Sequence, residues 1–253
     1  AHLHAGGGAQ PVHDPADLLE RELMTLSFVG ISISSSTSSP IAATLPTGAT
    51  TGDLAFRHWV GYGNNATPPA VADPSGWNRL SRAIFDTSYG ITVPDQTWEN
   101  VIWWRYLDGT ADDTATVTKD SVQSVHQEDI VAYRGLADGC RASNLSISAT
   151  SGGTWTPPPP AGVRSTDAVF AFRVTNSGFP VGGAPWSSAP SGWTGDWEQQ
   201  RNAGGGLTQG LYFASRIGDA SGFTVGRNTA QQVTYAVFSL IPPNLTHTGG
   251  MTT

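Results

Sequence analysis

From residue 26 onward, short runs of apolar residues alternate with clusters of Gly, Pro, Asn, Asp and Ser. The runs are rich in Val, Ile, Thr, Phe, Tyr and Trp, and such runs bounded by turn residues predict β-strands. The expected strands are 26–34, 54–62, 77–86, 98–107, 114–118, 124–133, 145–149, 168–175, 192–199, 209–216 and 232–240. This pattern predicts an all-β chain.

Residues 1–25 differ from the rest. Residues 1–13 are rich in Gly and His without apolar periodicity, which predicts an extended arm. Residues 14–24 predict one short helix, with Asp14 as its N-cap and Pro15 in its first turn. Its apolar face consists of Leu18, Leu19, Leu23 and Met24. A helix of two to three turns does not persist alone in water, so we expect this face to dock, on its own domain or on another subunit.

The strand region contains two halves, about 26–135 and 144–241, that repeat the same motifs in the same order. Pro-Ser-Gly-Trp occurs at 74–77 and again at 190–193, and an Asp precedes a strand at Asp53 and Asp167. Residues 101–106 are matched with 211–216, and 129–133 with 235–239. A half alone would expose sheet edges and hold a thin core, so we expect a single β-sandwich domain, jelly-roll-like, over 26–243 with a tail at 244–253.

Composition excludes several classes of function. The formal net charge is −7 and Lys119 is the only lysine, so no basic stripe is available for nucleic acid. The single Cys140 excludes an intramolecular disulfide framework and a Cys-rich zinc site. No apolar run reaches the length of a membrane span, and the N-terminus lacks the pattern of a signal peptide. We therefore expect a soluble, unprocessed chain, although a mature form that has lost a signal would look the same.

The sequence offers weak candidates for catalysis or metal binding. Glu99, Glu128 and Glu198 are the candidates for a glycosidase carboxylate pair, but no motif brings two of them together, and Gly-x-Ser-x-Gly is absent. His2, His4 and His13 do not have the spacing of a structural zinc site. Asp108, Asp112 and Asp113 could hold Ca²⁺, but without the ligand spacing of calcium loops we expect them to be solvated. We expect no enzyme activity, no metal and no cofactor.

Paired residues in the two halves favour structural roles. Asp53 and Asp167 are expected to bind nearby backbone N–H groups in turns. Trp77 and Trp193 are expected to be packing anchors rather than sugar platforms. The adjacent Trp103 and Trp104 must point to opposite faces of a strand, so one of them is expected to meet the N-terminal helix, a ligand or, preferentially, another subunit.

The order of these motifs resembles a known domain. Pro-x-Gly, Gly-Asp-Leu, Pro-Ser-Gly-Trp, Trp-Trp-Arg-Tyr and Ile-Val-Ala-Tyr-Arg-Gly-Leu follow one another between residues 46 and 136. This series is similar to a β-sandwich domain of minor tail, fibre and capsid decoration proteins of tailed bacteriophages, which also occurs as a module in bacterial secreted proteins. The resemblance covers most of the chain outside the arm and implies a structural or adhesive role, without catalytic residues.

The favoured interpretation is a structural virion protein of a tailed bacteriophage, assembled in the host cytoplasm and placed in capsid or tail. Its expected partners are other virion proteins, copies of itself in a trimer held partly by residues 1–25, and a host-surface glycan. The alternative is a carbohydrate-binding module of a secreted bacterial protein, in which Trp155 and Trp186 would contact the glycan. Neither interpretation includes nucleic acid or a membrane span.

Overall fold

The computed structural model describes residues 26–36, 40–63, 71–85, 97–118, 123–136, 142–148, 154–164, 167–177, 190–204, 207–219, 221, 223, 225–226 and 232–241. The arm and helix expected over residues 1–25 and the tail expected over 244–253 lie outside these residues. In the described part of the chain, no helix has the length and apolar character needed to cross a membrane.

The first half of the chain forms one antiparallel five-stranded sheet, here called sheet 1. Its strands lie in the order β1-β5-β2-β4-β3. They are β1 (Ser27–Ser36), β2 (Leu54–Gly63), β3 (Asn78–Phe85), β4 (Thr97–Tyr106) and β5 (Gln123–Arg134). Successive residues of a strand face opposite sides, so Leu54 and Phe56 of β2 point inward while Ala55 and Trp59 point outward.

The second half forms sheet 2, in the order β6-β12-β8-β10-β9. Its strands are β6 (Ala142–Ser148), β8 (Ala168–Ser177), β9 (Thr194–Gly204), β10 (Leu207–Ile217) and β12 (Gln232–Ile241), and a small separate pair consists of β7 (Thr154–Trp155) and β11 (Val225–Gly226). Leaving out that pair, both sheets place the first strand of the half beside the fifth, followed by the second, fourth and third. Each half thus contributes one complete sheet, and its strands do not alternate between the two layers.

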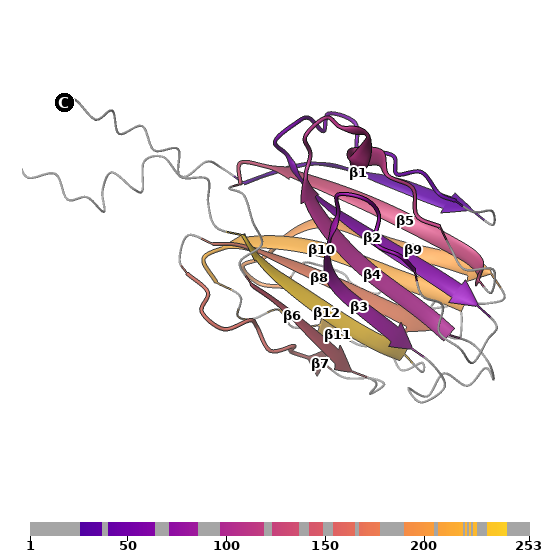
Figure 1. Cartoon of the computed structure of the whole chain (residues 1–253). Coiled ribbons are helices and arrows are strands. Elements are labelled where there is room, and N and C mark those ends of the chain that lie inside the picture. Colours follow the sequence, from indigo (N-terminus) through magenta and orange to yellow (C-terminus); the bar gives the residue numbers. More distant parts are fainter. Residues whose placement is uncertain are drawn as a thin grey trace, which may run out of the picture.

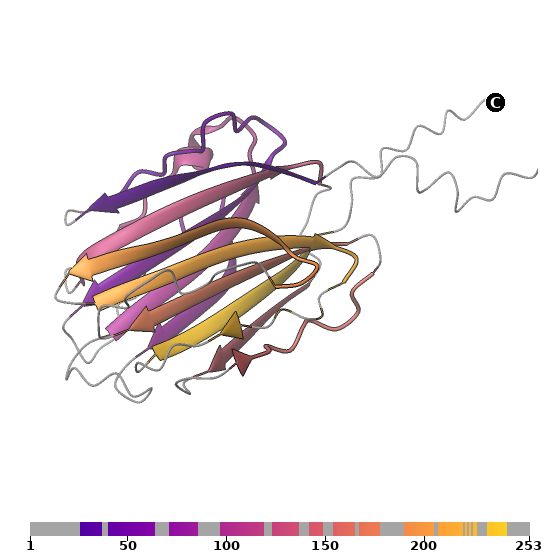
Figure 2. The same cartoon turned by 180° about the vertical axis from the view of Figure 1, so that it is seen from behind.

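The two sheets stack face to face as a sandwich (Figures 1 and 2), which confirms the predicted all-β sandwich architecture. The core between them is aromatic. The ring centroid of Phe56 in β2 lies 5.0 Å from that of Phe170 and 4.7 Å from that of Phe172, both in β8. Tyr133 of β5 lies 4.5 Å from Phe170. Aromatic rings at these spacings bury large apolar areas, so residues of both halves share one core.

Sheet 2 lies across sheet 1 in the reverse order of strands. The Tyr133 hydroxyl of β5 donates a hydrogen bond of 3.0 Å to Asp196 Oδ2 of β9, while β12 contacts β3. Because β2 lies on β8 in the middle, the two halves are related by an approximate two-fold rotation. This arrangement puts the two first strands of the halves, β1 and β6, at opposite edges of the sandwich.

Each sheet also has a smaller core on its outer face, covered by loops of its own half. On sheet 1, Trp59 and Trp103 pack with Trp77, Leu107 and Val117 of the connecting segments. On sheet 2, Val169 and Tyr212 pack with Trp193 and Phe223. The sandwich is therefore covered on both outsides by ordered connections.

The tryptophan pair of β4 is divided between two cores. Trp103 is fully buried in the outer core of sheet 1, and Trp104 is half-buried against the core between the sheets. Both side chains are thus packed by the chain itself, which removes the reason for expecting a subunit interface at this pair.

One expected strand is wrong. Residues 114–118 form no strand; a single 3₁₀ turn, η3 (Ala111–Thr114), is followed by an isolated bridge between Ile41 and Val117. The carboxylates of this segment bind its own backbone N–H groups, for example Gly109 N–H to Asp113 Oδ2 at 2.8 Å. Side-chain bonds of this kind compete with the pairing of a strand ladder.

The matching of the two halves also needs correction. Ala55 pairs with Arg105 between β2 and β4, and the equivalent Val169 of β8 pairs with Arg216 of β10. Arg105 therefore corresponds to Arg216, whereas the sequence match placed it one residue earlier. In β12 the match is displaced by two residues, because Phe56 pairs with Val131 and Phe170 with Ser239. A shift of one residue exchanges the two faces of a strand, so the corrected register decides which residues are equivalent.

Candidate functional site

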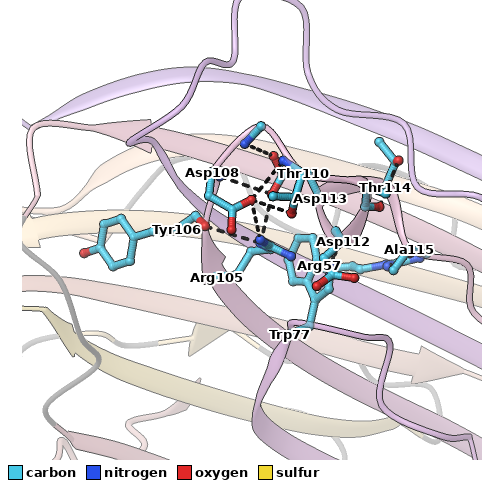
Figure 3. Close-up of polar contacts among 12 residues, drawn as sticks. Arg57, Trp77, Arg105, Tyr106, Asp108, Thr110, Asp112, Asp113, Thr114 and Ala115 are labelled. Carbon is cyan, nitrogen blue, oxygen red and sulfur yellow. Dashed lines mark hydrogen bonds and ion pairs between the residues drawn. The ribbon is translucent and has the colours of Figure 1, made fainter.

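A cluster of buried polar contacts lies on the outer face of sheet 1, where the chain enters β3 and leaves β4 (Figure 3). The Pro-Ser-Gly-Trp turn enters β3, with Trp77 N–H donating to Pro74 O at 3.1 Å and Gly76 at a φ of 73°. The indole Nε1 of Trp77 donates to Asp112 O at 2.9 Å. The exposed fraction of Trp77 is 6%, so the predicted role of a packing anchor is confirmed.

The second half repeats this turn at the entrance to β9. Trp193 N–H donates to Pro190 O at 3.0 Å, and Gly192 has a φ of 80°. The Trp193 indole donates to Ser221 O at 3.1 Å, and the residue is also 6% exposed. Both tryptophans thus join the turn before the third strand of their half to the loop after its fourth strand.

An arginine at the end of the fourth strand completes the arrangement in each half. Arg105 Nη2 lies 2.8 Å from Asp108 Oδ1, which also accepts hydrogen bonds from the Thr110 N–H and hydroxyl at 3.0 and 2.6 Å. These two hydrogen bonds, together with the Arg105 guanidinium, hold the pKa of Asp108 below its usual value. The Arg105 guanidinium and the Thr110 N–H thus both find their partner in Asp108, a residue of the same loop.

In the second half Arg216 Nη2 lies 2.9 Å from Asp219 Oδ2. Asp219 accepts hydrogen bonds from the Ser221 N–H and hydroxyl at 2.7 and 2.9 Å, and these bonds lower its pKa. The shared motif is Arg-x-x-Asp-x-(Thr/Ser), at 105–110 and 216–221. We call this motif, with the Pro-Ser-Gly-Trp turn beneath it, the arginine latch. The sequence match missed it because it was displaced by one residue in β10.

The glycine of the turn lies directly under the arginine. A Cβ added to Gly76 would lie 2.5 Å from Arg105 Nη1 and 2.8 Å from Asp112 Cβ. At Gly192 the nearest atom of Arg216 would be 3.1 Å away. Both glycines therefore serve the backbone conformation and the close approach of the arginine side chain.

Replacing Gly76 by Ala is expected to destabilise the protein by about 2–4 kcal/mol, from the cost of positive φ together with crowding. Gly52→Ala is the matched control, since Gly52 has a φ of 92° but no atom within 4 Å of the added Cβ. We expect it to cost about 1 kcal/mol. Urea unfolding of the two variants measures the difference, and equal losses would show that the contact with Arg105 does not matter.

The first half extends the latch with a second carboxylate. Asp113 Oδ1 lies 2.9 Å from Arg105 Nε, and its Oδ2 accepts the Gly109 N–H. The Asp113 residue is only 4% exposed, whereas the Asp108 side chain is 55% exposed. The prediction of solvated carboxylates is therefore confirmed for Asp108 and wrong for Asp113, which binds an arginine where a calcium ion was considered.

A buried ion pair lies beside the latch. Arg57 Nη2 of β2 is 2.6 Å from Glu128 Oε2 of β5, and both residues are at most 1% exposed. Arg57 Nη1 donates to Ala115 O at 2.7 Å, and its guanidinium lies 5.4 Å from the centroid of the Trp77 ring. Burial raises the pKa of Glu128 more than Arg57 lowers it. Arg57 therefore ties β5, the loop after η3 and the turn before β3 to one strand.

The second half has no counterpart of this pair. Its register places Ala171 at the position of Arg57 and Ala236 at that of Glu128. On the inner face, His58 Nδ1 lies 3.5 Å from Asp129 Oδ2, and both residues are fully buried. The corresponding residues are Phe172 and Val237. The same topology thus has two buried polar pairs in the first half and apolar residues at these positions in the second.

The paired Asp residues hold turns, as expected. Asp53 Oδ2 accepts the Thr50 N–H at 2.8 Å, and Asp167 Oδ2 accepts the Arg164 N–H at 2.7 Å. Asp53 also binds Arg134, whose Nε and Nη2 are each 2.7 Å from a carboxylate oxygen. Burial opposes ionisation of Asp53, but the bonds from Arg134 and Thr50 outweigh it and lower the pKa.

Of the three carboxylates considered for glycoside hydrolysis, the two whose side chains the structure describes are bound to arginines. Glu99 is fully buried and its Oε1 lies 2.6 Å from Arg82 Nε, while burial raises its pKa. Glu128 is bound to Arg57. The side chain of Glu198 lies outside the described part. Hydrolysis requires two carboxylates that flank a substrate, and the arginine partners occupy Glu99 and Glu128 instead.

Several candidate residues fall where the structure makes no statement. Leu18, Leu19, Leu23, Met24, His2, His4, His13 and Trp186 lie outside the described residues. Trp155 belongs to β7, where it pairs with Val225, but its side chain is not described. Among the described residues, no group of three or more His, Cys, Asp or Glu could hold a metal ion.

Comparisons of the chain with protein-family models and with curated proteins give no match.

Proposed function

We propose that this chain is a non-catalytic structural virion protein of a tailed bacteriophage, either a minor tail, tail-tip or fibre protein or a capsid decoration protein. The observation that carries the proposal is the repeated motif series that resembles the phage sandwich domain. The proposal places the chain in the virion after assembly in the host cytoplasm.

The roles of the motif residues support this proposal. Pro-Ser-Gly-Trp forms the turn of the arginine latch in both halves, and the Asp before the second strand closes a turn in both halves. Residues that fix turns and loops in this way suit a structural module, because such a module acts through its shape and not through a reactive site. The resemblance is thus one of architecture rather than of a reactive site.

Covered outer faces also suit a building block. Loops on both outsides of the sandwich are packed into their own cores. On sheet 1, Arg57 holds the loop after η3 by its hydrogen bond to Ala115 O, and Arg105 holds the loop after β4 by ion pairs with Asp108 and Asp113. A particle component must keep its surface geometry while it contacts neighbours. Connections that are held at several points have little freedom to rearrange on assembly.

Residues 1–25 are the proposed assembly segment. Their apolar side chains Leu18, Leu19, Leu23 and Met24 would dock on a neighbouring subunit, in a homo-oligomer that we propose to be a trimer. Host-surface glycan and other virion proteins are the remaining proposed partners.

Immunogold electron microscopy on particles from the source culture tests the proposal, with antibody raised against the purified chain. We expect gold on capsids or tails, which also distinguishes head from tail. The control is the same antibody adsorbed with excess purified chain, which must abolish the label. Label only on cell surfaces or free material would contradict the virion role.

A further inference from the structure

The four edge strands of the sandwich differ in how they are protected. The third strands of the halves carry charges: β3 has Arg79 and Arg82, and β9 has Asp196, Glu198 and Arg201. The first strands carry none, because β1 reads SFVGISISSS and β6 reads ASNLSIS, without Asp, Glu, Lys, Arg or Pro. Charges and prolines are the usual means by which proteins prevent pairing at a sheet edge.

Strand β1 has the features of a pairing edge. It is ten residues long and, among the described strands, has β5 as its one neighbour. Ile33 is 47% exposed and Phe28 is 36% exposed, and they are two of the three exposed large hydrophobic residues in the described part. The bulge at Val29 leaves the stretch from Gly30 to Ser36 regular. A long, uncharged edge with exposed apolar side chains favours addition of another strand.

Strand β6 is the counterpart of β1 in the second half, and β12 is its one neighbour among the described strands. The register places Leu145 of β6 at the position of Ile33 in β1. Both strands alternate Ser or Asn with aliphatic residues in their sequences, as at residues 31–34 and 144–148. Because the two halves are related by an approximate two-fold rotation, these edges face opposite sides of the sandwich.

We propose that β1 of one copy pairs with β6 of a second copy, so that sheet 1 of one subunit continues into sheet 2 of the next. The occupant is a second copy because this pairing uses at once the two edge strands of the sandwich that, among the described strands, lack charged residues and proline. The charged edges β3 and β9 are poor competitors, since a charged strand would place its charges beside the apolar face of β1. Head-to-tail contacts of this kind form rings or filaments. The inference rests on the proposed assembly role and gives β1 and β6 as the contact surface between copies.

Charge placed on the edge tests the interface in the full chain. Sedimentation velocity of the unaltered protein is expected to show oligomers that grow with concentration. Ile33→Lys is expected to raise the dissociation constant at least about tenfold, which corresponds to about 1.4 kcal/mol. Ile217→Lys is the matched control, since Ile217 is equally exposed at 47% but ends the interior strand β10. Equal oligomerisation of both variants, or a monomer at every concentration of the unaltered chain, would overturn the proposal.

Cross-linking identifies which edges meet. In a Cys140→Ser background, one differently tagged chain carries Cys at Ser34 of β1, since the Ser32 hydroxyl binds Thr44 O of its own chain. The other chain carries Cys at Ser146 or Ser148 of β6. Mild oxidation is expected to join the two tagged forms. Disulfides only between two chains altered in β1 would overturn the β1–β6 pairing.

The two proposals fail separately. Edge pairing is measured on purified protein in solution, and the virion role is measured by gold label on particles. Pairing without label would retain the interface and remove the virion role, whereas label on particles with monomers in solution and no cross-link would do the opposite.

Discussion

Replacing Arg57 by Ala is expected to lower the free energy of unfolding by about 3–5 kcal/mol, the usual cost of removing one partner from a buried ion pair. Glu128 would remain at 1% exposure without its cation. The variant also loses the bond to Ala115 O and the contact with the Trp77 ring. Urea unfolding at pH 7.5 measures the loss, and a loss below 1 kcal/mol would contradict the proposed role of the pair.

The pH dependence of this variant follows from Glu128. Burial already raises the pKa of Glu128 in the folded protein, and removing Arg57 raises it further. A folded pKa above the unfolded value means that the folded state binds more protons between the two values. The stability of Arg57→Ala is therefore expected to fall as pH rises from 5 to 7.5, more steeply than that of the unaltered chain. Adding Glu128→Gln is expected to remove this extra slope.

Two further variants separate charge from packing. Arg79→Ala removes an arginine of the same sheet whose ion pair with Asp73 is exposed, with side chains 34% and 43% exposed. It is expected to cost at most about 1 kcal/mol. The double variant Arg57→Met/Glu128→Leu replaces the ion pair by apolar side chains, as the second half does at these positions. It is expected to be more stable than Arg57→Ala.

The sequence predicted those features that local chemistry determines. Ten of the eleven expected strands form, since their apolar runs end at turn residues. Asp53 and Asp167 hold turns, and Trp77 and Trp193 are anchors, because these roles depend on neighbours close in the chain or on size alone.

Features that depend on register were missed. Arg57 and Glu128 are next to polar residues in the sequence, His58 and Gln127 among them, and so resemble solvated strand positions. The loops that bury them come from residues 40–53 and 107–118. Arg105 and Arg216 could be matched only after the pairing of β4 and β10 with their neighbours was known. Asp113 resembles a solvated acidic turn until the end of β4 brings Arg105 beside it. Only the Arg57–Glu128 pair joins segments far apart, 71 residues in sequence. The other two features depend on where β4 and β10 end relative to their neighbours.

Phe56→Ala is expected to remove about 3–5 kcal/mol, the usual cost of truncating a buried Phe. Phe56 is fully buried and touches Phe170 and Phe172 of the other half as well as Tyr133 of its own. The cavity would lie between the sheets, where backbone ladders on both sides resist collapse. Phe28→Ala is the matched control, because Phe28 is 36% exposed at the sheet edge and touches only the rim of this core; we expect a loss of at most about 1.5 kcal/mol, since little apolar area is removed.

The number of steps in the unfolding transition tests whether the two halves share one core. If the two halves share one core, Phe56→Ala must lower the unfolding midpoint of both together, and the transition must stay single when followed by fluorescence and by circular dichroism. Separate transitions, with only one shifted by Phe56→Ala, would mean that each half unfolds on its own. Because the shared core is what holds β1 and β6 at opposite edges of one body, a two-step transition would also weaken the geometry on which head-to-tail pairing depends.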